Sequence, residues 1–270
     1  MATAVFFHAH PDDEAIATGG TMALAAEAGH RVVLVLATQG EQGEPIEGVL
    51  ADGEQLGDRR AAEVADAAAI LGVHRYEFLG YRDSGMMGEP TNDEPDCFWQ
   101  ADLDEAADRL ADILREESAD VLTVYDSHGG YGHPDHIQVH RVGIEAATRA
   151  GVERVFESTM NRTRIMAMVD AMIEADLADA DMKERRANMD DEPFGSPESS
   201  LTHCIDVAAI AGRKKAAMAA HASQIGPDAF FLTMPDDQFA ASFGREWYIA
   251  RFDGSAADRK AGEFATNLFS

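Results

Sequence analysis

The stretch VFFHAHPDDE, residues 5–14, joins a short apolar run directly to histidine and carboxylate side chains. Residues 5–7 have the composition of a buried strand in a parallel sheet. Pro11 cannot continue such a strand because its nitrogen carries no hydrogen. The polar residues therefore follow the carboxyl end of the first strand, where open α/β sheets place their ligand sites. Imidazole and carboxylate groups this close together suit a divalent metal ion, so the stretch predicts an active site.

Similar apolar runs recur and alternate with helical patterns. Further strands are predicted at residues 31–38, 76–79, 121–125 and 155–158, with helices at 14–28, 58–71, 103–114 and 134–150. Strands separated by helices in this way predict an α/β fold, a mostly parallel sheet with helices on both faces. No Gly-x-Gly-x-x-Gly turn follows the first strand, which argues against a dinucleotide site.

The second half of the chain is less regular. A helix is expected at 162–181, a short strand at 202–207, a helix at 210–223 and an edge strand at 245–251. Residues 182–200 carry many charges and two prolines, and we expect them to form a mobile acidic loop. Because the later elements still resemble parts of the same fold, residues 1–270 are expected to form a single domain.

The charge balance is strongly acidic, with 49 Asp and Glu residues against 22 Lys and Arg residues and a net charge of -27. This balance argues against nucleic acid as a partner, because phosphate contacts need clustered Lys and Arg. A solvated acidic surface explains it most simply. Adaptation to high salt, where a carboxylate-covered surface tolerates screening, is the sharper hypothesis.

Targeting signals are lacking in the sequence. No apolar run approaches about 18 residues, so no membrane span is expected. The N-terminus has no basic region before an apolar segment, as a signal peptide would. The two cysteines, Cys97 and Cys204, do not make a disulfide framework and fit a reducing compartment. A cytoplasmic location is therefore expected.

A second polar segment, GGYGHPDH at residues 129–136, follows the strand predicted at 121–125. Taken alone, residues 10–14 could be a helix N-cap with acidic residues favoured by the helix dipole. Residues 129–136 could equally be a glycine-rich turn that leads into a helix. Because both segments follow strands of one sheet, they can converge, and two accidents at one edge are improbable. We expect the active site at the carboxyl ends of the first and fourth strands.

The pairing of AHPDDE at residues 9–14 with HPDH at 133–136 resembles the zinc-dependent N-acetylglucosaminyl deacetylases of the LmbE/PIG-L type. This family includes the deacetylases of mycothiol biosynthesis and the mycothiol S-conjugate amidases. The resemblance implies a Rossmann-like sheet and extends to about residue 160. Further matches are Arg60 and Glu63 in an Arg-x-x-Glu helix, the GEQGE segment at 40–44 and the RDSGM segment at 82–86.

The resemblance implies His10, Asp13 and His136 as metal ligands. Two imidazoles and one carboxylate leave an open position for water, as a catalytic zinc requires. Iron(II) is also accepted by such a donor set. The implied cofactor is therefore Zn²⁺, with Fe²⁺ as the alternative.

Four further residues have implied catalytic roles. Asp12 resembles the general base, which accepts a proton from water whose pKa the metal has lowered. His133 matches the family histidine that stabilises the tetrahedral intermediate or protonates the leaving amine. Asp135 is implied as the orienting partner of His133. Tyr131 corresponds to a mobile tyrosine that polarises the carbonyl.

Arg60 and Asp83 are implied contacts to the sugar, with an ordinary surface ion pair as the alternative. His221 lies in the segment HASQ, which resembles a recurrent family helix, but a structural role is favoured for it. Glu14 is expected beside the site or as a helix N-terminal charge.

These observations predict a metal-dependent hydrolase that removes an N-acetyl group from an N-acetylglucosamine-type sugar or conjugate. One alternative is an amidase that cleaves a larger amide, such as a mycothiol S-conjugate. Another is a metal-dependent sugar-binding protein without turnover, although simple binding needs neither the base Asp12 nor His133. The expected partner is a small N-acetylated sugar. Homo-oligomer formation is left open, and the aglycone depends on the long loops 39–57 and 80–100 and on the acidic segment 182–200.

Overall fold

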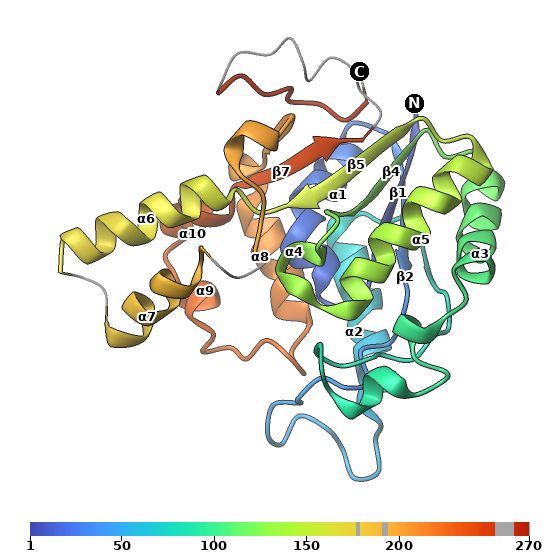
Figure 1. The fold of residues 1–270 in the computed structure, drawn as a ribbon, viewed down its shortest axis with the longest axis horizontal. Helices are drawn as coiled ribbons and strands as arrows, with labels where there is room; N and C mark the ends of the chain where they lie inside the picture. The colour runs from blue at the N-terminus through green and yellow to red at the C-terminus, as the bar shows by residue number, and fades with distance from the viewer. Residues whose placement is uncertain (177–178, 191–193, 252–261, 270) are drawn as a thin grey trace.

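The computed structural model describes residues 1–176, 179–190, 194–251 and 262–269. Its centre is one sheet with the strand order β3-β2-β1-β4-β5-β7-β6 (Figure 1). The strands are β1 (Thr3–His8), β2 (Arg31–Leu36), β3 (Arg75–Phe78), β4 (Val121–Tyr125), β5 (Arg154–Thr159), β6 (His203–Asp206) and β7 (Arg245–Ala250). Strands β1 to β5 pair in parallel, which confirms the predicted mostly parallel sheet.

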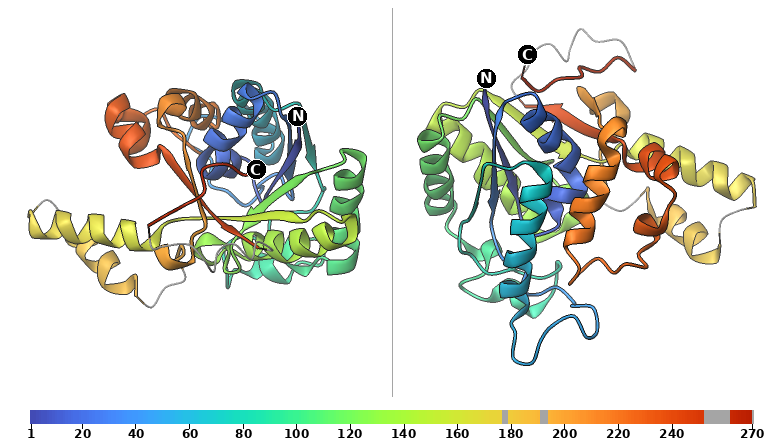
Figure 2. Two further views of the ribbon diagram at one scale, coloured as in Figure 1. Left: turned by 90° about the horizontal axis from the view of Figure 1, so that it is seen from above. Right: turned by 180° about the vertical axis from the view of Figure 1, so that it is seen from behind.

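The helices cover both faces of this sheet (Figure 2). The longer ones are α1 (Gly19–Glu27), α2 (Leu56–Leu71), α3 (Leu103–Glu116), α5 (Pro134–Ala150), α6 (Arg162–Glu174), α7 (Ala180–Asn188), α8 (Ala211–Ala220) and α10 (Asp236–Phe243). The short ones are α4 (Gly129–Gly132), α9 (Phe230–Thr233), the π-helical turn η1 (Glu14–Thr18) and the 3₁₀ turns η2 (Pro90–Asp93), η3 (Phe98–Gln100), η4 (Glu198–Ser200) and η5 (Ala208–Ile210).

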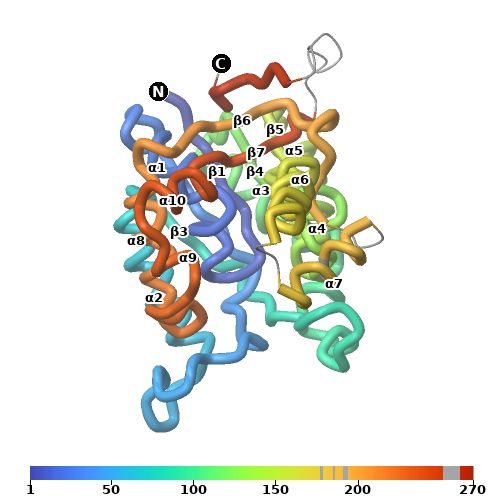
Figure 3. The backbone as a smooth tube through the Cα atoms, turned by 90° about the vertical axis from the view of Figure 1, so that its left-hand side faces the viewer, coloured from blue at the N-terminus to red at the C-terminus, as the bar shows by residue number. Residues whose placement is uncertain are grey.

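Alternate residues of β1 face two separate apolar cores. Val5 and Phe7 pack in the core that α3 and α5 cover. Phe6 packs in the core on the opposite face, with α1, α8 and α10. All three side chains are fully buried, as expected for a central parallel strand. Helices α6 and α7 project away from both layers in Figure 1, and they face the viewer in Figure 3.

The predicted helix boundaries follow from identifiable residues. Helix α2 ends at Gly72, which takes φ +80°, and α5 begins at Pro134 as its first residue. The helix predicted at 14–28 is divided into η1 and α1. Gly20 is needed there because a Cβ atom would lie 2.5 Å from the Cβ of Val207.

Two expectations for the second half were wrong. The strand expected at the edge, β7, lies inside the sheet and pairs antiparallel with both β5 and β6. Its Tyr248 is fully buried, and β6 takes the edge. Residues 182–200, expected as a loop, contain most of α7 and the turn η4, while residues 191–193 lie outside the described part. An ion pair between Arg186 and Asp170 of α6 helps α7 to form.

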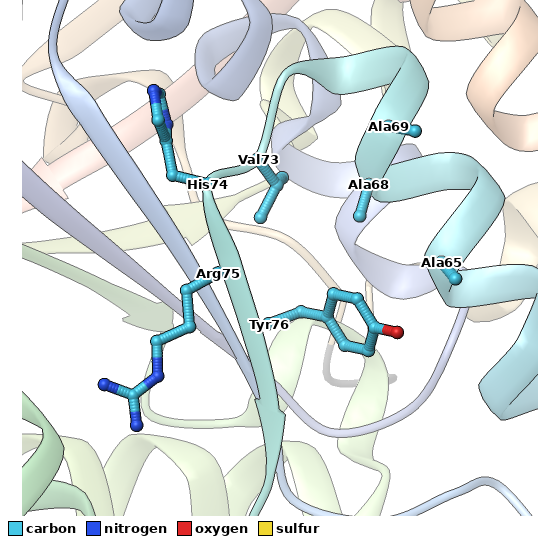
Figure 4. A pocket seen from close by; sticks show the side chains of 7 residues that line it. All are labelled: Ala65, Ala68, Ala69, Val73, His74, Arg75 and Tyr76. Atoms are coloured by element: carbon cyan, nitrogen blue, oxygen red, sulfur yellow. The ribbon is translucent and has the colours of Figure 1, made fainter.

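One surface feature lies apart from the polar segments. A pocket lined by Ala65, Ala68, Ala69 and residues 73–76 opens where α2 leads into β3 (Figure 4). This is the amino end of β3, opposite to the carboxyl ends of the strands. Among the described residues, no helix combines the length and apolar character needed to cross a membrane.

Candidate active site

The polar segments that follow β1 and β4 meet at the carboxyl edge of the sheet. These strands are neighbours, and the strand order reverses between them. Asp13 Oδ2 lies 3.4 Å from His10 Nδ1 and 3.3 Å from His136 Nε2. Although burial opposes ionisation, the two histidines hold the pKa of the Asp13 carboxyl well below its usual range. Two imidazoles therefore face one ionised carboxylate oxygen.

His133 brings a third imidazole to the same place. Its ring centroid lies 4.6 Å from that of His10 and 5.1 Å from that of His136. One ligand atom from each of these three histidines falls within 4.8 Å of the other two. His10 forms a second group of this kind with Asp83 and Asp135. Both Asp13 and His133 can therefore accompany His10 and His136 as donors.

The carboxylate of Asp135 faces His10 instead of His133. Its Oδ2 lies 3.1 Å from His10 Nε2, whereas only its backbone N–H donates to His133 Nδ1, at 3.1 Å. We expected the Asp135 carboxylate to orient His133, but it contacts His10 instead. The turn at the start of α5 directs the side chain of Asp135 towards the segment that follows β1. His10 thus has one nitrogen towards Asp13 and the other towards a carboxylate, an arrangement that fixes the ring of a metal-ligating histidine.

Ser84 connects the loop at 80–100 to this arrangement. It is fully buried, its backbone N–H donates to Asp135 Oδ2 at 2.9 Å, and its hydroxyl donates to Asp135 Oδ1. Its own carbonyl accepts hydrogen bonds from the side chains of Thr91 and Asn92. The loop is therefore joined through Asp135 to His10.

Asp12 has an unusual backbone conformation. Its φ is +89°, in the region that favours glycine. A conformation of this kind persists only where the surroundings enforce it, and it is concentrated at functional sites. Burial raises the pKa of the Asp12 carboxyl to about 7, against the opposing charge of Arg60. A carboxyl with such a pKa can take up and release a proton near neutral pH.

Arg60 is only 4% exposed, so the alternative of a surface ion pair was wrong. Its guanidinium lies 3.3 Å from Asp12 Oδ2 and donates to the carbonyl oxygens of Gly40 and Pro11. Asp83 is similarly buried, and its carboxylate accepts backbone N–H groups of Gln42 and Gly85. Both side chains stiffen the loops around the site.

Tyr131 is the most open of the predicted site residues. It lies in α4, between glycines with positive φ, and is 47% exposed. Its hydroxyl lies 3.4 Å from His136 Nε2. This position leaves the phenol at the edge of the polar cluster.

Comparison with known proteins connects this geometry to a family. The family described as "PIG-L: GlcNAc-PI de-N-acetylase" matches residues 5–147, which contain both polar segments. The 1D-myo-inositol 2-acetamido-2-deoxy-alpha-D-glucopyranoside deacetylase of Acidothermus cellulolyticus is 45% identical, over 90% of this chain and 86% of its own. The chain belongs to the PIG-L family. The predicted resemblance is confirmed, and the protein is an enzyme of the deacetylase type that acts on an amide bond.

Two further comparisons cover more than nine tenths of the chain. The deacetylase of the same name from Nocardiopsis dassonvillei is 41% identical, over 97% of this chain and 98% of its own. The solved structure of N,N'-diacetylchitobiose deacetylase from Pyrococcus horikoshii superimposes with a TM-score of 0.60 at 19% identity, covering 92% of this chain and 83% of that one. The second likeness supports the shared fold.

The donor set of this PIG-L enzyme fits a divalent metal. Imidazole nitrogens and a carboxylate oxygen converge from the β1 and β4 segments, and the carboxylate is ionised. Zn²⁺ and Fe²⁺ both accept such ligands. The buried pairing of His10 with Asp135 supplies the outer hydrogen bond that ligating histidines have in metal sites.

Sequence reasoning did not place Glu14 and His221 together in this PIG-L site. Both side chains are fully buried, and His221 Nε2 lies 2.6 Å from Glu14 Oε1. Glu14 Oε2 accepts the backbone N–H of Asp12. The sequence signal was weak, since the only hints were a glutamate beside the metal segment and a histidine that ends an Ala-rich helix.

Proposed function

We propose that this chain hydrolyses the acetamide of 1D-myo-inositol 2-acetamido-2-deoxy-α-D-glucopyranoside, releasing acetate and the free amine. Relatives with this activity in their names are 45% and 41% identical to the chain and match 90% and 97% of it. The matched length includes the loops at 39–57 and 80–100, which border the polar cluster. The observation that carries the hydrolytic chemistry is the position of Asp12 in the same turn as His10 and Asp13.

His10, Asp13 and His136 would hold the metal, which we propose to be zinc, with iron(II) as an alternative that the same donors accept. When bound, such a metal supplies a Lewis acid for the acetamide carbonyl and lowers the pKa of a coordinated water. His133 stays outside the ligand set in this proposal. Its Nδ1 accepts the backbone N–H of Asp135, and its Nε2 is assigned to the substrate.

Asp12 is the proposed general base. Arg60 occupies its Oδ2, and among the described residues no donor contacts Oδ1. Oδ1 therefore accepts the proton when water attacks the carbonyl carbon. The pKa of about 7 keeps a substantial fraction of Asp12 ionised at neutral pH and lets it release the proton afterwards.

His133 is the proposed hydrogen-bond donor to the developing oxyanion. Its Nδ1 accepts the Asp135 backbone N–H, so the proton of the neutral ring resides on Nε2. Burial, together with His10 and His136, lowers the pKa of His133 to about 3. A neutral ring with a fixed donor stabilises negative charge on oxygen, and this favours oxyanion stabilisation over protonation of the leaving amine.

Two other residues complete the proposal at the substrate. Tyr131, exposed at the edge of the cluster, is the proposed second donor to the carbonyl oxygen. Asp83 is the proposed sugar contact, through Oδ1, which lies 3.5 Å from His10 Nε2. Arg60, which is occupied by Asp12 and two backbone carbonyls, is proposed to hold the base instead of the sugar.

A direct assay tests this function. Purified, metal-replete protein is incubated with N-acetylglucosaminyl-inositol, with free N-acetylglucosamine and with a mycothiol S-conjugate, and released amine is measured. We expect the highest kcat/KM for the inositol conjugate. Faster release from the mycothiol conjugate would reassign the enzyme as an amidase for larger groups, and release from none of the three would contradict the proposal.

A further inference from the structure

The turn that contains the proposed base is held by a residue from the other end of the chain. His221 follows α8, 207 positions after Glu14, and the two side chains form a hydrogen bond of 2.6 Å with no solvent exposure. The second oxygen of Glu14 accepts the backbone N–H of Asp12 at 3.0 Å. One carboxylate thus joins the imidazole of His221 to the backbone of Asp12.

The conformation of Asp12 makes this connection significant. A residue with a Cβ atom is disfavoured at φ +89°, so the surroundings must enforce this value. Arg60 holds the side chain of Asp12, and Glu14 holds its N–H. Without the Glu14 contact the turn could relax, and the carboxylate of Asp12 would change direction.

Glu14 in turn depends on His221. Without His221, Glu14 Oε1 would be a buried carboxylate oxygen with no partner, which is costly, and the carboxylate would rotate towards another donor. His221 Nε2 contacts Glu14 Oε1, while His221 Nδ1 is buried without a hydrogen-bond partner among the described residues. Within the described parts of the chain, the ring therefore has one polar contact, and that contact is Glu14.

The position of His221 is itself fixed from both sides. Its backbone N–H donates to Met218 at the end of α8, and its carbonyl accepts from Ile225. Two residues later, Ser223 donates its N–H and hydroxyl to the carboxylate of Glu63 on α2. The backbone of this turn is thus held by contacts that do not involve Glu14, so the imidazole is presented to Glu14 from a rigid support.

We propose that His221 is a positioning residue for Asp12. By donating to Glu14 it keeps the Glu14 carboxylate on the Asp12 N–H, which keeps the base directed at the attacking water. The inference rests on the proposed function, in which Asp12 is the base. It also means that a residue beyond the 5–147 family match completes the active site.

The test compares His221→Ala and His221→Gln with the matched control Ser223→Ala. All three alter the same turn, but only the first two change the contact with Glu14. For metal-replete His221→Ala we expect kcat for amine release to fall about 10–100-fold, with KM and the metal dissociation constant within about threefold of wild type. His221→Gln, which keeps a side-chain N–H donor, should recover a large part of kcat. Ser223→Ala removes the hydroxyl bond to Glu63 but keeps the backbone N–H bond that supports the turn, so it should lower the midpoint of thermal unfolding and keep kcat within about threefold.

A second readout does not depend on catalysis. Hydrogen exchange of the Asp12 backbone amide should accelerate at least about tenfold in His221→Ala and stay unchanged in Ser223→Ala. If His221→Ala does not fold, Glu14→Gln, which alters the carboxylate that contacts both His221 and the Asp12 N–H, takes its place in the comparison. Unchanged kcat and Asp12 exchange in His221→Ala, or in Glu14→Gln where it takes its place, would overturn the inference, as would a kcat loss in Ser223→Ala equal to that in His221→Ala. If the wild type shows no deacetylase activity but Asp12 amide exchange is still faster in His221→Ala, the proposed function is refuted. The structural contact from His221 to Asp12 is then retained.

Discussion

The carboxylate of Asp135 lies 3.1 Å from Nε2 of His10, although the residues are 125 positions apart. Asp135 also receives both donors of the buried Ser84. A proposed metal ligand, a residue of α5 and the loop at 80–100 are therefore joined by hydrogen bonds. This arrangement makes the loop and the metal site dependent on each other.

Removal of the Asp135 charge should weaken metal binding. In Asp135→Asn the hydrogen bond to His10 loses its ionic partner, and the metal dissociation constant should rise about 10–100-fold. Ser84→Ala should show a smaller rise in the same direction. Competition with a chromogenic chelator measures both. Thr91→Ala is the control because it contacts Ser84 but not Asp135, and an equal loss of affinity in that variant would contradict the account.

The sequence predicted the meeting of the two polar segments because parallel strands place their carboxyl ends at one edge. It could not predict the partner of Asp135, since the direction of a side chain at a helix start depends on the packing of α5 against the sheet. The sequence implied Arg60 as a sugar contact and could not predict its burial beside Asp12, as only the folded loop at 39–57 brings Gly40 over its guanidinium. The contact of His221 with Glu14 joins residues 207 positions apart, and no local pattern encodes that.

The interior position of β7 and the helix α7 show a second limit. The sequence pattern of β7 fits an edge strand as well as an interior strand. β7 is an interior strand because β6 pairs with its outer side. Helix α7 is weakly apolar, so its sequence resembles a loop. Its pairing with α6 through Arg186 and Asp170 is a tertiary contact.

Removal of one partner from a buried ion pair should destabilise the fold strongly, because it leaves the other charge buried and unpaired. Lys214 Nζ lies 2.7 Å from Glu246 Oε1, both side chains are 2% exposed, and Glu246 also accepts the N–H groups of Gly20 and Thr21. Lys214→Met leaves a buried carboxylate without its cation, and should lower the free energy of unfolding by about 3 kcal/mol in urea titration.

The adjacent lysine provides the control for this measurement. Lys215 pairs with Asp236, which is 91% exposed, so Lys215→Met should cost less than about 1 kcal/mol. An equal loss of unfolding free energy in Lys214→Met and Lys215→Met would contradict the prediction that breaking the buried pair costs more than breaking the exposed pair.

Glu117 should make stability depend on pH at the amino end of the strands. Hydrogen bonds from Arg31, then Arg75, lower its pKa from 4.5 to about 2. Because the folded pKa is depressed, the stabilisation is complete above about pH 4.5 and is lost as pH falls towards 2. We expect the stability difference between wild type and Glu117→Gln to be about 1–2 kcal/mol at pH 7, after allowance for solvent screening, and to vanish near pH 2. A difference independent of pH between 7 and 2 would refute this.

The acidic surface should make the protein more stable in salt. Repulsion within a net charge of -27 is screened as ionic strength rises. The midpoint of thermal unfolding should therefore increase between about 0.1 M and 2 M KCl. A flat or falling midpoint across the series would remove the hypothesis of adaptation to high salt.

The most direct test of the account is the rate of amine release from N-acetylglucosaminyl-inositol by metal-replete Asp12→Ala. Its metal content should equal that of wild type, because Asp12 is not a proposed ligand, whereas His136→Ala should lose metal. We predict that the Asp12→Ala rate falls about 10²–10⁴-fold, as expected for loss of a general base. A metal-replete Asp12→Ala protein that turns over at the wild-type rate would contradict the account.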